Sequence, residues 1–236
     1  MDQLIHLHPS APLADRVLLP GDPGRALRLA QALLDEPKMF NHNRGLWGYT
    51  GTAADGQLLT IQSTGMGGPS TAIVVWELID LGARRLLRVG TCGGLDASLE
   101  LGQLVLASGA LSDDGTSRAL GADGSIAPAS SGLLAALRSA AARTPTLGRV
   151  ADGPVVSTDL FYGASDREPA WREAGAVAVE MEAATLFAIA EKRGVEAGCA
   201  LIVSDLLHAG RDRIGLEHLH AAELRLGELA ALALAA

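Results

Sequence analysis

Residues 86–94, LLRVGTCGG, pass directly from an apolar run into a glycine-rich segment. Leu86–Val89 predicts a buried strand, because the strands of parallel or mixed sheets are apolar on both faces. Glycines directly after a strand let the backbone approach a ligand closely, and ligands of α/β sheets bind outside the carboxyl ends of the strands. We therefore expect a central strand that ends in a binding loop.

Further predicted strands and helices lie on both sides of this segment. Apolar runs alternate with helical patterns, which predicts a three-layer α/β/α single domain with a central mixed β-sheet over residues 1–236. The other predicted strands are Arg16–Pro20, Leu58–Gln62, Leu104–Ala107, Val177–Val179 and Ala200–Val203. The predicted helices are Gly24–Leu34, Ser70–Leu81, Gly132–Arg143, Glu182–Arg193 and Leu216–Leu234.

Smaller signals set some of the boundaries. Pro69 suits the first turn of a helix, and Gly82 and Gly194 suit the ends of two helices. Residues 113–131 are rich in Gly, Ser and Ala and show no clear period, so we expect a surface excursion there.

Composition narrows the class of protein. The 236 residues are 48% hydrophobic and 19% charged, which is typical of a globular chain. No apolar run reaches the ~18 residues of a membrane helix, and the N-terminus has no export signal, so we expect a cytoplasmic protein without a membrane partner. Two cysteines, Cys92 and Cys199, are too few for a disulfide framework or a zinc site. A net charge of -8 argues against a nucleic-acid partner.

Two of the glycine loops contain an arginine. Gly21 and Arg25 lie in PGDPGR at residues 20–25, where a helix start and a guanidinium would together favour an anion. The alternative is a Pro/Gly turn with a solvated arginine. Arg88 lies inside an apolar strand and needs an anionic partner, either a structural carboxylate or a ligand. Neither a GxxxxGK[ST] loop nor a GxGxxG after the first strand is present, so the sequence supports neither an NTPase nor a dinucleotide fold.

Seven motifs occur together in one order. They are RVLLPGDPGRA (16–26), RGLWGYTG (44–51), TGMGGPS (64–70), RVGTCGG (88–94), STDLFY (157–162), VEMEAATLFA (179–188) and VSD (203–205). This series closely resembles bacterial nucleoside phosphorylases of the hexameric type, a family that includes purine nucleoside phosphorylase and uridine phosphorylase. The resemblance extends from about His6 to Asp205.

The resemblance implies a site for inorganic phosphate as co-substrate, with no metal and no organic cofactor. Its phosphate ligands would be Gly21, Arg25, Arg88 and Thr91, with Arg44 supplied by the neighbouring subunit of a homohexamer built as a trimer of dimers. His6 of that neighbour would contact the ribose 5′-hydroxyl, with His8 as the alternative. Taken without the family, the segment around His6 reads as a mobile terminus.

The resemblance also implies the ribose and base sites. Glu182 would accept hydrogen bonds from the ribose hydroxyls, beside Met181 and Met66. From the residues alone, Glu182 reads as a helix cap and the methionines as core. The base would lie among Cys92, Gly93, Phe161, Val179, Ser204 and Asp205, although Phe161 and Tyr162 also suit a core, and Asp205 also suits a helix cap.

The proposed chemistry assigns Asp205 the role of acid. A purine leaves poorly as an anion, so a protonated Asp205 would protonate its imidazole nitrogen while phosphate captures the ribose from the other face. Arg211, Arg213 and His218 are the alternatives for a group that assists it.

The substrate class follows from a few markers. Uridine phosphorylases read the pyrimidine with a glutamine and an arginine; this chain has Ser165 at the place of the glutamine and Arg167 near that of the arginine. Asp205 replaces the asparagine typical of that branch. Two of these three markers, Ser165 and Asp205, favour a purine nucleoside over uridine, and the sequence leaves open whether the purine is 6-oxo or 6-amino. A nucleoside hydrolase, a non-catalytic nucleoside-binding homologue and a purely structural oligomer are the remaining alternatives.

Overall fold

The computed structural model describes residues 4–236, and within this range the chain forms a mixed sheet of eleven strands. The strands are β1 (Arg16–Leu19), β2 (Asp35–Asn41), β3 (Gly48–Thr52), β4 (Leu58–Gln62), β5 (Arg85–Gly94), β6 (Leu104–Asp113), β7 (Ile126–Pro128), β8 (Val150–Thr158), β9 (Ala178–Glu180), β10 (Glu196–Leu206) and β11 (Asp212–Arg213). The mixed α/β fold with a central mixed sheet is confirmed.

Part of the sheet closes on itself. Strand β5 pairs in parallel with β10 and antiparallel with β9, and the pairs β10–β6, β6–β8 and β8–β9 complete a ring of strands. The rest of the sheet extends from β5 through β1, β4 and β3 to β2. Strand β5 therefore belongs to both parts, and its carboxyl end lies inside the molecule rather than at an open edge.

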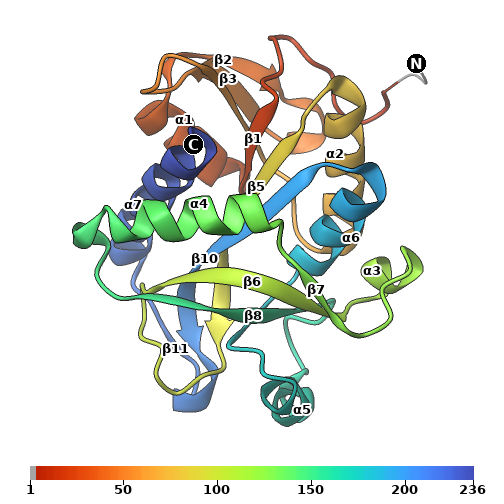
Figure 1. Cartoon of the computed structure of the whole chain (residues 1–236), viewed down its shortest axis with the longest axis vertical. Coiled ribbons are helices and arrows are strands. Elements are labelled where there is room, and N and C mark those ends of the chain that lie inside the picture. The colour runs from red at the N-terminus through yellow and green to blue at the C-terminus, as the bar shows by residue number, and fades with distance from the viewer. Residues whose placement is uncertain (1–3) are drawn as a thin grey trace.

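Helices cover both faces of the sheet (Figure 1). On one side α7 (Leu216–Leu234) packs against α1 (Pro23–Leu33) and α4 (Ser131–Ala142). On the other, α6 (Ala183–Arg193) packs against α2 (Gly68–Leu81) and α3 (Gly115–Ala119). Helix α5 (Glu168–Glu173) lies apart from both groups, near the end of the closed ring. None of the helices formed by residues 4–236 has the length and apolar character needed to cross a bilayer.

All the predicted helices are present within one or two residues of their expected bounds. Pro69 lies in the first turn of α2. Gly82 and Gly194 end α2 and α6 in the left-handed conformation, with φ of 118° and 63°, which glycine adopts at low cost. Local chemistry alone was sufficient to predict these boundaries.

Three predictions about the strands were wrong. Strands β5 and β10 continue through Gly94 and Leu206, so Gly90–Gly94 and Ser204–Asp205 lie within strands and not in loops after them. Residues 113–131 are not merely a surface excursion, because they include α3 and β7 and bury Asp114. Strands β2, β3, β7, β8 and β11 were not predicted. Pairing with two neighbours keeps a glycine-rich segment extended although its own propensity for β-structure is low.

Candidate active site

A cavity of about 460 Å³ lies where β5, β9 and β10 meet the loops after β1 and β4. Its walls contain most of the site residues that the sequence motifs indicated, and these residues come from segments far apart in the chain. These are Gly21, Arg25, Met66, Arg88, Thr91, Cys92, Gly93, Phe161, Val179, Met181, Glu182, Ser204 and Asp205. The closed ring explains this convergence, because it places β9 and β10 on either side of β5.

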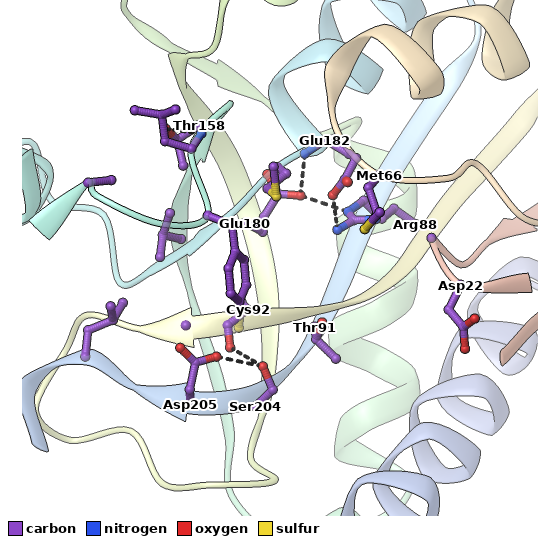
Figure 2. Close-up of a pocket in the computed structure, with 18 of the residues that line it drawn as sticks. Asp22, Met66, Arg88, Thr91, Cys92, Thr158, Glu180, Glu182, Ser204 and Asp205 are labelled. Carbon is purple, nitrogen blue, oxygen red and sulfur yellow. Dashed lines mark hydrogen bonds and ion pairs between the residues drawn. The ribbon is translucent and has the colours of Figure 1, made fainter. Parts of the chain in front are cut away.

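Arg88 lies in the middle of β5 with 5% of its surface exposed. Its Nε donates to Glu180 Oε2 at 2.8 Å, and its Nη2 is ion-paired with Glu182 (Figure 2). Burial acts to lower the pKa of Arg88, but the pKa is raised because Glu182 and Glu180 stabilise the charge. The expected anionic partner is therefore a pair of carboxylates, and the guanidinium also lines the cavity.

Glu180 is the residue that organises this region, and the sequence analysis did not assign it a role. Its carboxylate accepts from the backbone N–H of Glu182 at 2.8 Å and of Ala183 at 3.0 Å, at the start of α6. It also accepts a hydrogen bond from the Ser157 hydroxyl. Glu180 thus supplies the hydrogen bonds of a helix cap while holding Arg88.

Glu182 occupies the N-cap position of α6 but makes no side-chain capping bond, so its interpretation as a helix cap was wrong. Its Oε1 accepts from the backbone N–H of Gly67 at 2.5 Å, and its other oxygen faces Arg88. Burial raises the pKa of Glu182, and the ion pair with Arg88 only partly offsets this rise. The Glu182 side chain is left facing the cavity beside Met66 (Figure 2).

Arg25 is not a solvated arginine, since only 7% of its surface is exposed. Its Nε donates to Glu223 Oε1 at 2.8 Å, and Arg28 donates to Glu223 Oε2 from Nε at 3.0 Å and from Nη2 at 2.6 Å. The side chain of Glu223, on α7, is 2% exposed. Helix α7 therefore fixes the position of the first predicted phosphate arginine through a buried carboxylate.

The start of α1 differs from the expected anion site. Asp22 caps the helix and accepts from the backbone N–H of Gly24 at 2.9 Å and of Arg25 at 2.8 Å. These two N–H groups are already satisfied. Gly21 lines the cavity, and a Cβ at this position would lie 3.0 Å from the carbonyl oxygen of Gly65. Any larger residue at Gly21 would thus press the two loops apart.

Asp205 lies on β10 at a bulge. Val203 pairs with Cys92 and Asp205 with Gly93, so Ser204 is an extra residue in the strand. A bulge redirects the side chains that flank it. The Ser204 hydroxyl lies 2.9 Å from Asp205 Oδ1 and 3.2 Å from the carbonyl oxygen of Cys92. Figure 2 shows this cluster separate from that of Arg88 and Glu182. Asp205 caps no helix, which removes the competing interpretation.

Gly93 and Cys92 shape the surroundings of Asp205. A Cβ on Gly93 would lie 2.8 Å from Leu207 Cδ1 and 3.4 Å from Asp205 Oδ2, so glycine leaves room for the carboxyl group. Burial raises the pKa of the Cys92 thiol, and the side chain remains a neutral wall of the pocket.

The rim of the cavity is apolar and exposed. Met66 and Tyr162 are 85% and 78% exposed, and Phe161 packs edge-to-face against Tyr162 with ring centroids 4.9 Å apart. Interpretation of Phe161 and Tyr162 as core residues was therefore wrong. Large exposed apolar groups beside a cavity are typical of a surface that a ligand or a second protein covers.

Arg44 and His6 do not line the cavity within the described chain. Arg44 is exposed on a short turn with a φ of 56°. His6 is not part of a mobile terminus: its Nδ1 lies 2.8 Å from Glu77 Oε1, and Glu77 also accepts from the backbone N–H groups of His6 and Leu7. The roles assigned to Arg44 and His6 in a neighbouring subunit stay predictions, and His8 is exposed.

Of the three residues considered as partners of Asp205, only Arg211 lines the cavity. Arg213 lies across the strand pair from Asp205, with its guanidinium carbon 5.9 Å from the centre of the Phe161 ring. The uridine markers are also outside the wall: Ser165 is exposed, and Arg167 is paired with Asp113 at 2.9 Å. Within residues 4–236 no group of His, Cys, Asp and Glu is arranged to hold a metal ion.

Sequence reasoning missed Glu180, Glu223, Asp22, Glu168 and Trp171. Glu180 left a signal, since a second glutamate stands two residues before Glu182 in the motif VEME. Glu223 left none, because it lies 198 residues from Arg25 on a helix of ordinary amphipathic pattern.

Comparisons with known proteins agree with this geometry. Residues 15–236 match the family model described as the phosphorylase superfamily. A guanosine phosphorylase of Halorubrum lacusprofundi is 40% identical over 83% of this chain and 80% of its own length. A purine nucleoside phosphorylase DeoD-type of Alkaliphilus metalliredigens is 40% identical over 84% of this chain and 85% of its own.

A solved structure is similar over nearly its whole length. Uridine phosphorylase from Vibrio fischeri ES114, crystallised with 6-hydroxy-1-naphthoic acid, superposes with a TM-score of 0.83 at 28% identity, covering 94% of this chain and 91% of that one. The resemblance carried by the seven motifs is confirmed, and the chain belongs to the phosphorylase superfamily, among the nucleoside phosphorylases.

Proposed function

We propose that the chain is a purine nucleoside phosphorylase, a pentosyltransferase that converts purine nucleosides and phosphate to free base and ribose 1-phosphate. The observation behind this proposal is that Arg88, Glu182 and Asp205 face one cavity while Arg88 and Glu182 touch each other. An anion bound at Arg88 would lie next to a sugar held by Glu182. Two relatives of 40% identity that bear purine or guanosine phosphorylase names support the purine class.

The residues divide the cavity into three parts. Arg88, Arg25, Gly21 and Thr91 would hold phosphate by charge and hydrogen bonds. Glu182 would accept hydrogen bonds from the ribose hydroxyls and stabilise positive charge at the anomeric carbon, with Met66 and Met181 against the sugar. The base would occupy the end formed by Phe161, Val179, Cys92, Gly93, Ser204 and Asp205.

The reaction breaks the glycosidic C–N bond and forms a C–O bond. A proton from Asp205 moves to the imidazole nitrogen of the purine, so that the bonding electrons leave with a neutral base. A phosphate oxygen then attacks the anomeric carbon from the opposite face, which inverts its configuration. Inorganic phosphate is the co-substrate, and no step requires an organic cofactor or a metal ion.

Charge counting supports a contribution from a neighbouring subunit. Arg25, Arg28 and Arg88 carry +3, and Asp22, Glu180, Glu182 and Glu223 carry −4, so this cluster has a formal charge of −1. A phosphate dianion would gain from a further cation, and Arg44 of a neighbour in a homohexamer would supply it. Exposed Trp47, close to Arg44 in sequence, and Ile73 and Trp76 on one face of α2 suit a subunit contact.

We also propose that the protein is cytoplasmic. The two cysteines are unpaired and buried, as suits a reducing compartment such as the cytoplasm.

A second candidate, uridine phosphorylase, has the solved structure as its support. Ser165 and Arg167, at the positions that would read a pyrimidine, lie outside the cavity wall, and this favours the purine.

One assay separates the candidates. The protein is incubated with inosine, adenosine, guanosine or uridine, with and without phosphate, and release of base is followed. We expect phosphate-dependent cleavage of purine nucleosides. Cleavage of uridine alone would favour the second candidate, cleavage without phosphate would indicate a hydrolase, and no cleavage would indicate a binding protein. Size-exclusion chromatography with light scattering tests the hexamer; a fully active monomer would contradict it.

A further inference from the structure

Glu168 is a buried carboxylate in the cavity wall that the reaction above does not use. It begins α5, and only 9% of its surface is exposed. The cavity wall also includes Ala164, Trp171, Leu207 and Arg211, none of which is assigned to phosphate or ribose. A charged group is costly to bury unless it has partners or a function, so its contacts are informative.

The contacts of Glu168 leave one of its carboxylate oxygens facing Arg211, a second residue of the cavity wall. Glu168 Oε2 accepts from Arg172 Nη2 at 3.2 Å, and Arg172 is itself anchored by donating to the carbonyl oxygen of Leu95 at 3.0 Å. Glu168 Oε1 lies 4.0 Å from Arg211 Nη2, too far for a direct hydrogen bond. A carboxylate oxygen and a guanidinium therefore lie side by side on the wall, close enough to bind two adjacent atoms of one ligand.

This pair lies at the base end of the cavity. Arg211 follows β10 closely, and its backbone N–H donates to the carbonyl oxygen of Leu206, the residue after Asp205. Trp171, on the same helix as Glu168, belongs to a small apolar cluster against which Val179 and Leu207 pack, and all three residues line the cavity. Asp205, Glu168 and Arg211 thus line one and the same cavity.

Helix α5 is held firmly enough to position a recognition group. Trp171 Nε1 donates to Asp113 Oδ2 at 2.9 Å, and Arg167 Nη1 pairs with the same oxygen at 2.9 Å. These bonds tie both ends of the segment that contains Glu168 to strand β6. A carboxylate on a braced element discriminates between ligands better than one on a loop, because the loop can move to accommodate the wrong one.

We propose that Glu168 and Arg211 read the edge of the purine ring and select 6-oxopurines, with guanine preferred; this rests on the proposed function. Guanine presents there an acceptor, O6, and two donors, N1–H and the 2-amino group. Arg211 donates to O6, and the Glu168 carboxylate accepts from N1–H and from the 2-amino group. Hypoxanthine lacks the 2-amino group but retains the contact of Arg211 with O6 and that of Glu168 with N1–H.

Adenine presents the opposite pattern at the first two positions. Its 6-amino group would meet the Arg211 donors, and its unprotonated N1 would meet the Glu168 carboxylate. A site built to bond one pattern rejects the other, because the buried Glu168 carboxylate is then left without a donor, while the Arg211 side chain, 41% exposed, can still reach solvent. The choice between 6-oxo and 6-amino purines, open at the level of sequence, is thereby assigned to two residues.

The test compares substrates and one isosteric variant. With saturating phosphate, kcat/KM is measured for guanosine, inosine and adenosine, and we expect guanosine above inosine and both well above adenosine. Glu168→Gln keeps the volume but offers an amide N–H to adenine N1, so the guanosine-to-adenosine ratio should fall at least about tenfold. Glu173→Gln, an exposed position on the same helix, is the matched control and should leave the ratio unchanged.

The outcomes separate this inference from the proposed function. Failure of every nucleoside to react with phosphate refutes the phosphorylase itself. Cleavage of adenosine as efficiently as guanosine, or an unchanged ratio in Glu168→Gln, overturns the role of Glu168 and leaves the phosphorylase intact. If the variant does not fold, calorimetry with the unaltered protein decides: guanine should bind at least about tenfold more tightly than adenine, and equal affinities overturn the inference.

Discussion

Replacing Glu223 by alanine should impair the use of phosphate while leaving the use of the nucleoside almost unchanged. Glu223 is buried on α7, remote from the sugar and base residues, and it orients Arg25 by a 2.8 Å hydrogen bond. Without the carboxylate, the Arg25 guanidinium loses the partner that fixes its direction toward the cavity.

The size of the effect follows from the contacts. A hydrogen bond to a charged group contributes about 1.5–3 kcal/mol, and each ~1.4 kcal/mol corresponds to a factor of ten. If phosphate binding is weakened by this amount when Arg25 loses its fixed orientation, KM for phosphate should rise about 10- to 150-fold. Breaking a buried ion pair by removing one partner also destabilises the fold, by about 3–5 kcal/mol.

Steady-state phosphorolysis, with phosphate and nucleoside varied independently, measures the effect, and urea denaturation reports the loss of stability. Arg28→Ala is the matched control: Arg28 is 34% exposed and its removal leaves the Arg25–Glu223 bond in place, so KM for phosphate should change little. If Glu223→Ala folds and has an unaltered KM for phosphate, then Glu223 does not position Arg25. Glu223→Gln, which keeps the volume, replaces the alanine variant if that one does not fold.

Three further predictions concern the cavity itself. Asp205→Asn should lower kcat on purine nucleosides about 100- to 10,000-fold with little change in KM for phosphate, and equal losses in both would contradict an acid role. Arg88→Ala should sharply raise the phosphate requirement and, by leaving Glu180 and Glu182 without a cation, cost about 3–5 kcal/mol of stability in urea denaturation; a stability within 1 kcal/mol of the parent would refute this ion-pair account. Gly90→Ala should also raise KM for phosphate, because its Cβ would lie 2.7 Å from Arg88 Nη2; a variant with unaltered kinetics would show that Arg88 moves aside without cost.

The sequence predicted the helices better than the strands, for a physical reason. Helix ends are local: Gly82, Gly194 and Pro69 act on their own neighbours, and the structure has each in its expected role. Strand ends depend on partners. The predicted loop at Gly90–Gly94 is a strand because β9 and β10 both pair with it, and no property of these five residues announces that pairing.

The residues of the candidate site also divide into those that a local motif predicts and those that depend on distant partners. Arg88 and Glu182 belong to motifs that predict their roles, and they line one cavity. The carboxylates that hold the arginines have no such signal of their own role: Glu180 stands beside Glu182 in the same motif, and Glu223 comes from a distant helix. Glu168 belongs to no motif, and only its burial and the nearby Arg211 mark it. Sequence patterns indicate which groups touch a ligand; packing shows which groups hold them.

The two ends of the sheet bear on how copies of this chain can associate. Strand β2 is exposed over Asp35–Met39, carries charges and Pro37, and has an irregular register next to β3, while β11 is a two-residue strand of Asp212 and Arg213. Short, charged or proline-containing edge strands resist pairing with another chain. Joining of sheets edge to edge, the route by which many β-rich proteins aggregate, is therefore disfavoured at both ends. Subunits of an assembly would meet through side chains on helices and turns, which leaves the hydrogen-bonded framework of each copy complete in itself.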